Sequence, residues 1–230
     1  MRQRWEQLLF LHWAVDPAEA AEVLPRGLEV DTYDGAAHVG IVGFRMRGVR
    51  PAGLTALPWL SYFNELNVRV YVRDEHGEPG VWFLSLDCDR GPAVRIARSF
   101  FGLPYEHAEM AYGFRDDLHR LDCRREGRPE TARYAWQADG PATPATPGSL
   151  TFHLAERYNF FCVKGGRLLR GQVHHAPYEL AAARVPSWSQ LPAVWDGLRL
   201  PDRQPDLAHC SAGVNIRAYG LIDVHAQKAR

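Results

Sequence analysis

The sequence predicts a mainly β fold, an antiparallel barrel or strongly bent sheet with a few short peripheral helices. About ten β-prone segments follow one another along the 230 residues, and the helical segments do not alternate regularly with them, which argues against a parallel sheet. Two turn signals, Asp34-Gly35 and Lys164-Gly165-Gly166, stand between β-prone runs and favour hairpins. We expect a single domain over residues 1–230, since barrels of this size often remain undivided.

The first part of the chain predicts a strand, a capped helix and a hairpin. The helix begins at Asp16, with Pro17 in its first turn and Glu19 placed to complete a capping box. The Asp34-Gly35 turn predicts that the strand before it pairs with the strand after it. The predicted segments are a strand over 6–14, the helix after it, paired strands over 28–33 and 36–47, and a loop over 50–59.

The middle of the chain predicts further strands around one short helix. Residues 64–74 alternate between apolar and polar side chains, which is typical of a strand. The nearly continuous apolar run over 81–89 favours a strand that is buried on both faces. A short helix over 91–101 ends at Gly102. The remaining segments are strands over 110–125 and 132–139, a loop over 140–149, a helix over 149–158 capped by Ser149, a hairpin over 159–175, a Pro- and Trp-rich stretch over 186–205, and a final strand over 212–224.

Bulk charge and hydropathy give no sign of nucleic-acid or membrane binding. The formal net charge is +0 at pH 7, so no basic surface is indicated. No apolar stretch approaches the ~20 residues that a membrane-spanning helix needs. The short apolar run near the N-terminus lacks a small-residue cleavage site, so we do not expect a signal peptide. These features together favour a cytoplasmic protein.

Motifs for metals and cofactors are not found in the sequence. The four cysteines are scattered and include no C-x-x-C pair, which predicts neither a zinc site nor a disulfide framework. Glu106 and His107 are adjacent, so on a strand their side chains point to opposite faces. Glycine-rich phosphate-binding motifs do not occur either. We therefore expect no metal and no cofactor.

One strand predicts a candidate site. In residues 64–74, Glu65, Asn67 and Arg69 share the polar face. If that face is external, it is an ordinary solvated sheet surface. If it faces a cavity, Arg69 can bind a carboxylate with two parallel hydrogen bonds and can favour the ionised form of Glu65. We take Glu65 as a candidate catalytic residue, with Asn67 and Arg69 as candidate ligand-binding residues.

The hairpin over 159–175 offers a second polar face, on which Arg170, Gln172 and His174 alternate with apolar residues. His174 and His175 point to opposite faces of a strand, so at most one of them enters a cavity. We take His174, which shares the polar face, as a candidate general acid or base, and Arg170 as a candidate ligand-binding residue. The alternative is that the histidine has a structural role.

Several segments in this order resemble the YqjF-like family of uncharacterised bacterial proteins, over about residues 5 to 225. That family in turn resembles acetoacetate decarboxylase, which implies a cone-like antiparallel β barrel with a central, partly polar cavity. The resemblance also implies that the segment from Tyr62 to Glu65 places Glu65 in that cavity. The segments are LLFLHW, LPRGLEVDTYDGAAHVGIVGFRMRGVRP, NELNVRVYVR, GVWFLSLD, FGLPYEHAEM, AERYNFF and GRLLRGQVHHAPY.

The same resemblance argues against the decarboxylase reaction itself. The related enzyme forms a Schiff base through a lysine pair that follows a Gly-x-Pro turn. Here the matching turn, residues 102–104, is followed by Tyr105 and Glu106, neither of which forms an imine. Lys164 lies at a predicted hairpin tip, where solvation is expected. We therefore take Tyr105 as a candidate ligand-binding residue and expect no covalent lysine chemistry.

Two functions from different classes fit the sequence. The first is a small-molecule-binding barrel for an anionic or carbonyl-bearing metabolite, with Glu65, Arg69, Tyr105 and His174 lining the cavity, and with or without acid–base chemistry. The second is a non-catalytic interaction or scaffold protein that uses the Trp- and Pro-rich stretch, where Trp188 and Trp195 either cover one end of the barrel or form a contact between copies. A homo-oligomer is compatible with both.

Overall fold

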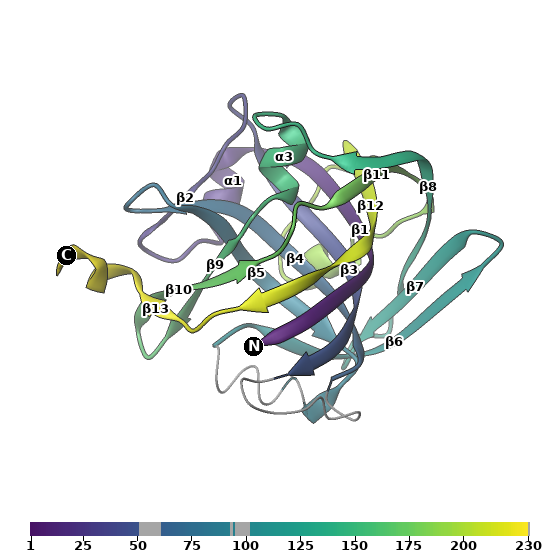
Figure 1. Ribbon diagram of the computed structural model, residues 1–230, viewed down its shortest axis with the longest axis horizontal. Helices are drawn as coiled ribbons and strands as arrows, with labels where there is room; N and C mark the ends of the chain where they lie inside the picture. The colour runs from purple at the N-terminus through teal and green to yellow at the C-terminus, as the bar shows by residue number, and fades with distance from the viewer. Residues whose placement is uncertain (51–60, 93, 95–101, 230) are drawn as a thin grey trace.

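The computed structural model describes residues 1–50, 61–92, 94 and 102–229, in which the strands join into one sheet that curves back on itself (Figure 1). The strands are β1 (Arg2–Val15), β2 (Leu28–Val30), β3 (Ala37–Arg50), β4 (Phe63–Asp74), β5 (Pro79–Cys88), β6 (Tyr105–Arg115), β7 (Leu118–Arg125), β8 (Ala132–Pro144), β9 (Asn159–Lys164), β10 (Arg167–His174), β11 (Glu179–Ser187), β12 (Leu207–Ala218) and β13 (Ile222–Asp223). The helices are α1 (Pro17–Ala21), α3 (Leu150–Ala155), α4 (Leu191–Trp195) and the 3₁₀ helix η1 (Val224–Ala229).

The strand pairings close two rings that share five strands. The shared sheet consists of β12, β1, β3, β4 and β5 in that order. Strands β9 and β10 complete one ring, which we call the small ring, and β6, β7, β8 and β11 complete the other, the large ring. The sheet divides at β5, which pairs with β9 at Val81–Trp82 and with β6 from Leu86 onward. The expected mainly β fold is confirmed, in a ring-like form rather than as a simple barrel.

Two pairings are parallel, between β5 and β6 and between β5 and β9. The sequence predicts antiparallel connections, so these two pairings differ from the prediction. In both cases the partners are not joined by a short turn, so local turn chemistry does not set their direction. The remaining pairings between strands are antiparallel.

The predicted pairing of residues 28–33 with 36–47 is wrong. β2 pairs with β4, and β3 pairs with β1 and β4. The turn itself forms: Asp34 and Gly35 have φ of 48° and 80°, and the only bridge across it joins Tyr33 to Ala36. The turn reverses the chain as predicted, but the strands on either side of it pair with strands from elsewhere in the sequence.

Other segment boundaries also differ. Residues 110–125 form parts of two strands, because Asp116 and Asp117, with φ of 51° and 59°, make a tight turn within them. The predicted loop over 140–149 begins as strand, since β8 continues to Pro144 alongside β11. The caps at Asp16 and Ser149 and the turn at Gly165-Gly166 are confirmed. The predicted loop over 50–59 and helix over 91–101 fall largely outside the described residues.

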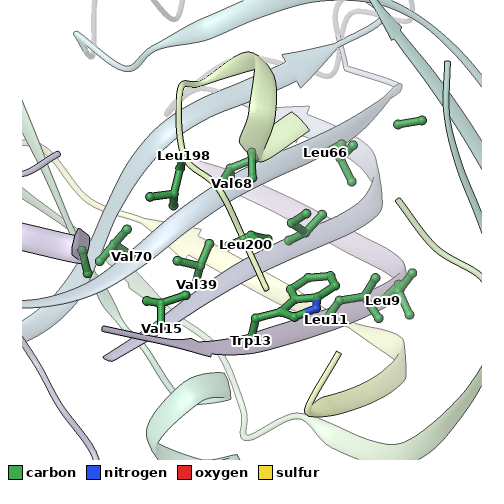
Figure 2. Close-up of a cluster of buried hydrophobic side chains, with 14 of the residues drawn as sticks. Leu9, Leu11, Trp13, Val15, Val39, Leu66, Val68, Val70, Leu198 and Leu200 are labelled. Atoms are coloured by element: carbon green, nitrogen blue, oxygen red, sulfur yellow. The ribbon is translucent and has the colours of Figure 1, made fainter. Parts of the chain in front are cut away.

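Both faces of the shared sheet are buried, which explains why its strands are so apolar. One face fills the large ring, where side chains of β1, β3 and β4 pack against Leu198 and Leu200 (Figure 2). The other face fills the small ring, and its apolar residues pack against Tyr178 and Val173. The apolar members of this small-ring face on the shared sheet include Leu8, Phe10, Val42, Phe44, Met46, Val214 and Ile216.

The Pro- and Trp-rich stretch contributes to the core of the large ring. Ala193 in α4 is fully buried, and the Trp188 ring lies 6.0 Å from the ring of Trp13. The guanidinium of Arg125 lies over the Trp195 ring at 5.2 Å. These tryptophans therefore cover the large ring, which is one of the two roles that the sequence left open.

Candidate functional site

Glu65 and Tyr105 form a hydrogen-bonded pair on the small-ring face. The register of β4, β5 and β6 brings them together, and Tyr105 Oη donates to Glu65 Oε2 over 2.9 Å. Burial raises the pKa of Glu65 to about 7, although hydrogen bonds from Tyr105 and Asn67 oppose that rise. Burial also raises the pKa of Tyr105 well above its ordinary value. Glu65 can thus exchange a proton near neutral pH, beside a neutral phenol.

Arg69 lies on the same face and is only 8% exposed. Its Nε donates to Tyr71 Oη over 3.1 Å, and its Nη2 donates to the backbone oxygen of Leu154 over 3.0 Å. Among the described residues, no carboxylate forms an ion pair with it. Buried charges in proteins are normally paired, so this guanidinium is suited to an anion from outside the chain.

His12 lies beside Tyr71 on the same face. Its Nε2 lies 2.7 Å from Tyr71 Oη, and both side chains are buried. Burial, reinforced by the charge of Arg69, lowers the pKa of His12 well below its ordinary value. The imidazole is therefore neutral at pH 7. Of the three neighbouring side chains Arg69, Tyr71 and His12, Arg69 carries the positive charge.

Several buried polar atoms on the small-ring face lack a hydrogen-bond partner among the described residues. A buried polar atom without a partner costs about 1–3 kcal/mol, so such groups usually contact water or a ligand. Water or a ligand could supply the missing partners on this face. The atoms are Trp5 Nε1, His12 Nδ1, His38 Nδ1, Asn67 Oδ1, His175 Nε2 and Ser211 Oγ.

Gly40 makes room for Arg69 and Tyr71. It lies opposite Arg69 in the β3–β4 pairing, and a Cβ atom there would lie 2.9 Å from Tyr71 Oη and 3.3 Å from Arg69 Cγ. We expect Gly40→Ala to lower the free energy of unfolding by about 1–3 kcal/mol, because neither neighbour can move without breaking a buried hydrogen bond. Urea unfolding measures this, with Gly113→Ala as the control because its Cβ would meet open space. Equal unfolding midpoints for the two variants would contradict the expected crowding.

The two candidates on β10 lie apart from Glu65. His174 is exposed, and Arg170 lies near two carboxylates, at 3.4 Å from Glu78 and 3.9 Å from Asp74. The polar face of β10 is turned away from the small-ring face, and His175, only 5% exposed, is on the inner side instead. Alternation showed that one histidine at most points inward; it did not show which.

His12, Tyr71 and His175 lie on this face but are not among the candidate residues predicted from the sequence. A signal for His12 was present, since a histidine in an otherwise apolar strand must be buried with a partner. Tyr71 belongs to the same alternating polar set as Glu65 and Arg69.

A second buried polar network lies on the large-ring face. Arg125 donates from Nε and Nη2 to the two carboxylate oxygens of Asp87 over 2.6 and 3.0 Å, and from Nη1 to Asp196 over 2.6 Å. Ser85 Oγ completes the network, donating to Asp196 over 2.5 Å. Burial raises the pKa of Asp87 to about 6, against the opposing effect of Arg125. The network links Asp196, the residue after α4, to β5 and β7.

A cavity of about 500 Å³ lies where β9 and β6 separate along β5. Lys164 adjoins the Gly102-Leu103-Pro104 turn at its edge, since a Cβ on Gly102 would lie 3.2 Å from Lys164 Cβ. The Lys164 side chain is exposed, as expected. The lining residues are Val23, Trp82, Phe83, Leu84, Gly102, Leu103, Pro104, Val163 and Asp196.

The comparisons with known proteins agree with this architecture. The model of the family DUF2071, described as an uncharacterized conserved protein, matches residues 2–215. The chain belongs to the DUF2071 family. This DUF2071 protein is 34% identical over 206 residues to the uncharacterized protein YqjF of Bacillus subtilis (strain 168), covering 89% of this chain and 85% of YqjF. The family resemblance expected from the sequence is confirmed.

Solved structures similar to this DUF2071 protein establish the acetoacetate decarboxylase-like fold. The enduracididine biosynthesis enzyme MppR complexed with pyruvate matches with a TM-score of 0.66 at 14% identity, over 96% of this chain and 89% of that one. Acetoacetate decarboxylase from Legionella pneumophila subsp. pneumophila str. Philadelphia 1 matches with a TM-score of 0.65 at 14% identity, over 98% and 89%. At this identity the likeness concerns the fold alone.

Among the described residues, no helix has the length and apolar character needed to span a membrane. Within the same residues, no group of three or more His, Cys, Asp or Glu side chains is arranged to hold a metal ion.

Proposed function

We propose that this protein binds a small carboxylate-bearing metabolite, such as a keto or hydroxy acid, on its small-ring face. Arg69 would receive the carboxylate, and Glu65 with Tyr105 would face another part of the ligand. The observation that carries the proposal is that Arg69 is buried without a carboxylate partner among the described residues. A similar fold binds a small keto acid in MppR, whose structure holds pyruvate.

The chemistry that suits this arrangement is non-covalent proton transfer. Tyr105 and Glu106 follow the Gly-Leu-Pro turn, and neither forms an imine with a carbonyl group. Glu65, with its pKa raised to about 7, would take or give a proton next to the bound carbonyl. Arg170 and His174 have no part in the proposed site, because Arg170 has carboxylate neighbours and His174 is exposed.

The scaffold alternative has less support. Trp188 and Trp195, which would carry a contact surface, pack against the core of the large ring. In α4 only Val194 among the large apolar side chains of the described residues is strongly exposed, at 53%.

Replacing Arg69 tests the proposal. We expect Arg69→Met to weaken the binding of pyruvate or acetoacetate at least about tenfold, because a buried charge-assisted pair with the carboxylate is lost. Isothermal titration calorimetry at pH 7 measures the dissociation constants. The control is Arg73→Met, on the same strand but with a half-exposed side chain, which should bind like the wild type. Unchanged binding in Arg69→Met, or no binding of any such acid by the wild type, would contradict the proposal.

A further inference from the structure

Trp5 and His175 are neighbouring rings on the small-ring face, and each carries a nitrogen without a hydrogen-bond partner among the described residues. Gln7 has a φ of 55° and lies in a bulge of β1, so Trp5 points to the same side as Leu8. The Trp5 and His175 ring centroids are 6.4 Å apart. Trp5 Nε1 and His175 Nε2 are both buried and have no hydrogen-bond partner among the described residues.

The two nitrogens have opposite hydrogen-bonding character. His175 Nδ1 lies 2.8 Å from the backbone oxygen of Ala176, which only accepts, so Nδ1 carries the proton. Burial lowers the pKa of His175, so the ring is neutral at pH 7 and Nε2 presents a lone pair. The indole nitrogen of Trp5 can only donate. The site therefore offers one donor and one acceptor.

A hydroxyl group matches this pair, because it accepts one hydrogen bond and donates another. A carboxylate or a ketone only accepts, and so it would leave His175 Nε2 unpartnered. Leaving such a buried group unpartnered is costly, and sites built to bond a hydroxyl discriminate strongly against analogues that lack one.

The pair belongs to the same face as the proposed carboxylate site. Trp5 contacts Phe44 at 5.0 Å between ring centroids, and Phe44 is the neighbour of Glu65 in the β3–β4 pairing. On the other side, the Tyr178 ring lies 4.5 Å from His175 and 5.2 Å from Phe10, over which Arg69 lies at 5.8 Å. Successive ring contacts therefore link the Trp5–His175 pair to Arg69.

We propose that Trp5 and His175 bind a ligand hydroxyl, and hence that the ligand of this face is a hydroxycarboxylate. The hydroxyl donates to His175 Nε2 and accepts from the Trp5 indole N–H, while the carboxylate lies at Arg69. This inference rests on the proposed function, which it deepens by naming the substrate class.

The test compares hydroxy acids with the same acids lacking the hydroxyl. The probes are 3-hydroxybutyrate, 5-hydroxypentanoate and 6-hydroxyhexanoate, and their partners are butyrate, pentanoate and hexanoate. Each hydroxy acid is thus compared with a plain acid of the same chain length, at three chain lengths. We expect at least one hydroxy acid to bind the wild type about fivefold or more tightly than its partner. Trp5→Phe, which keeps an aromatic ring but loses the N–H, should abolish that preference and leave the affinity for the plain acid within about twofold. Trp188→Phe, on the large ring, is the matched control and should keep it.

A second measurement needs no variant. In the wild type, the indole N–H resonance of Trp5 should shift with the preferred hydroxy acid and not with its partner. If no hydroxy acid is preferred at any chain length, or if the preference survives in Trp5→Phe, the hydroxyl site is contradicted. Water alone would then hydrogen-bond to the two nitrogens. Failure of the carboxylate proposal is distinguishable, since Arg69→Met would then leave every dissociation constant unchanged.

Discussion

Arg125→Met is expected to lower the free energy of unfolding by about 3–5 kcal/mol at pH 8, the largest loss we expect from a single substitution in this protein. Arg125 is 8% exposed and is the only cation that the described residues place between Asp87 and Asp196. Methionine keeps most of the volume but leaves two buried carboxylates without a counter-ion. Urea unfolding of both proteins measures the difference.

The neighbouring Arg124→Met is the matched control. Arg124 also forms an ion pair, with Glu109, but its side chain is 46% exposed. Exposed pairs are typically worth less than about 1 kcal/mol, so this variant should unfold close to the wild type. Similar losses in the two variants would show that burial of the Arg125 network does not decide its contribution.

The Arg125→Met loss should shrink as the pH falls. The pKa of Asp87 is already raised to about 6 with Arg125 present, so without the guanidinium the folded state holds the Asp87 proton to still higher pH. A pKa that is raised in the folded state adds stability as the pH falls through it. The difference from the wild type should therefore be smaller at pH 5.5 than at pH 8.

The sequence predicts local structure in this protein better than it predicts strand partners. The caps at Asp16 and Ser149 and the turn at Asp34-Gly35 depend on a few adjacent residues, and they form as expected. The partners of β2 and the parallel pairing of β5 with β9 depend on which distant apolar surfaces bury each other. No short-range pattern encodes that choice.

The same contrast between local pattern and long-range burial applies to the candidate site. Alternation alone places Glu65, Asn67 and Arg69 on one face of β4, and the structure keeps them together. Whether a polar face points inward depends on the ring that covers it, and the polar faces of β4 and β10 differ in this respect. The polar face of β4 is buried, whereas that of β10 carries the exposed His174. His175, which is buried, therefore could not be distinguished from its neighbour by sequence.

Glu65→Gln is expected to make the protein more stable at pH 8, by up to about 4 kcal/mol. The pKa of Glu65 is raised to about 7, whereas an unfolded glutamate titrates near about 4.3, and each pH unit between them corresponds to about 1.4 kcal/mol. The folded state keeps the Glu65 proton over that interval while the unfolded state has lost it. The stability of the wild type therefore falls as the pH rises from about 4.5 to about 7 and is constant above, as far as Glu65 determines it.

The glutamine variant escapes this loss because its side chain stays neutral and still accepts from Tyr105 Oη. The difference in free energy of unfolding should grow from near zero at pH 4.5 to its full value at pH 8, which urea unfolding at intermediate pH values measures. Glu179→Gln, at an exposed position in β11, is the control and should show no such growth. A difference that does not depend on pH would contradict the raised pKa.

The same Glu65→Gln variant separates a structural role from a functional one. If Glu65 only supported the fold, removing its charge would not be expected to stabilise the protein while impairing the site. A gain in stability at pH 8 together with weaker binding of the preferred acid would mean that the charge is retained for the ligand, at a cost to the fold. If the variant binds every acid as tightly as the wild type, Glu65 does not belong to the site, and Arg69 with the Trp5–His175 pair must account for binding alone.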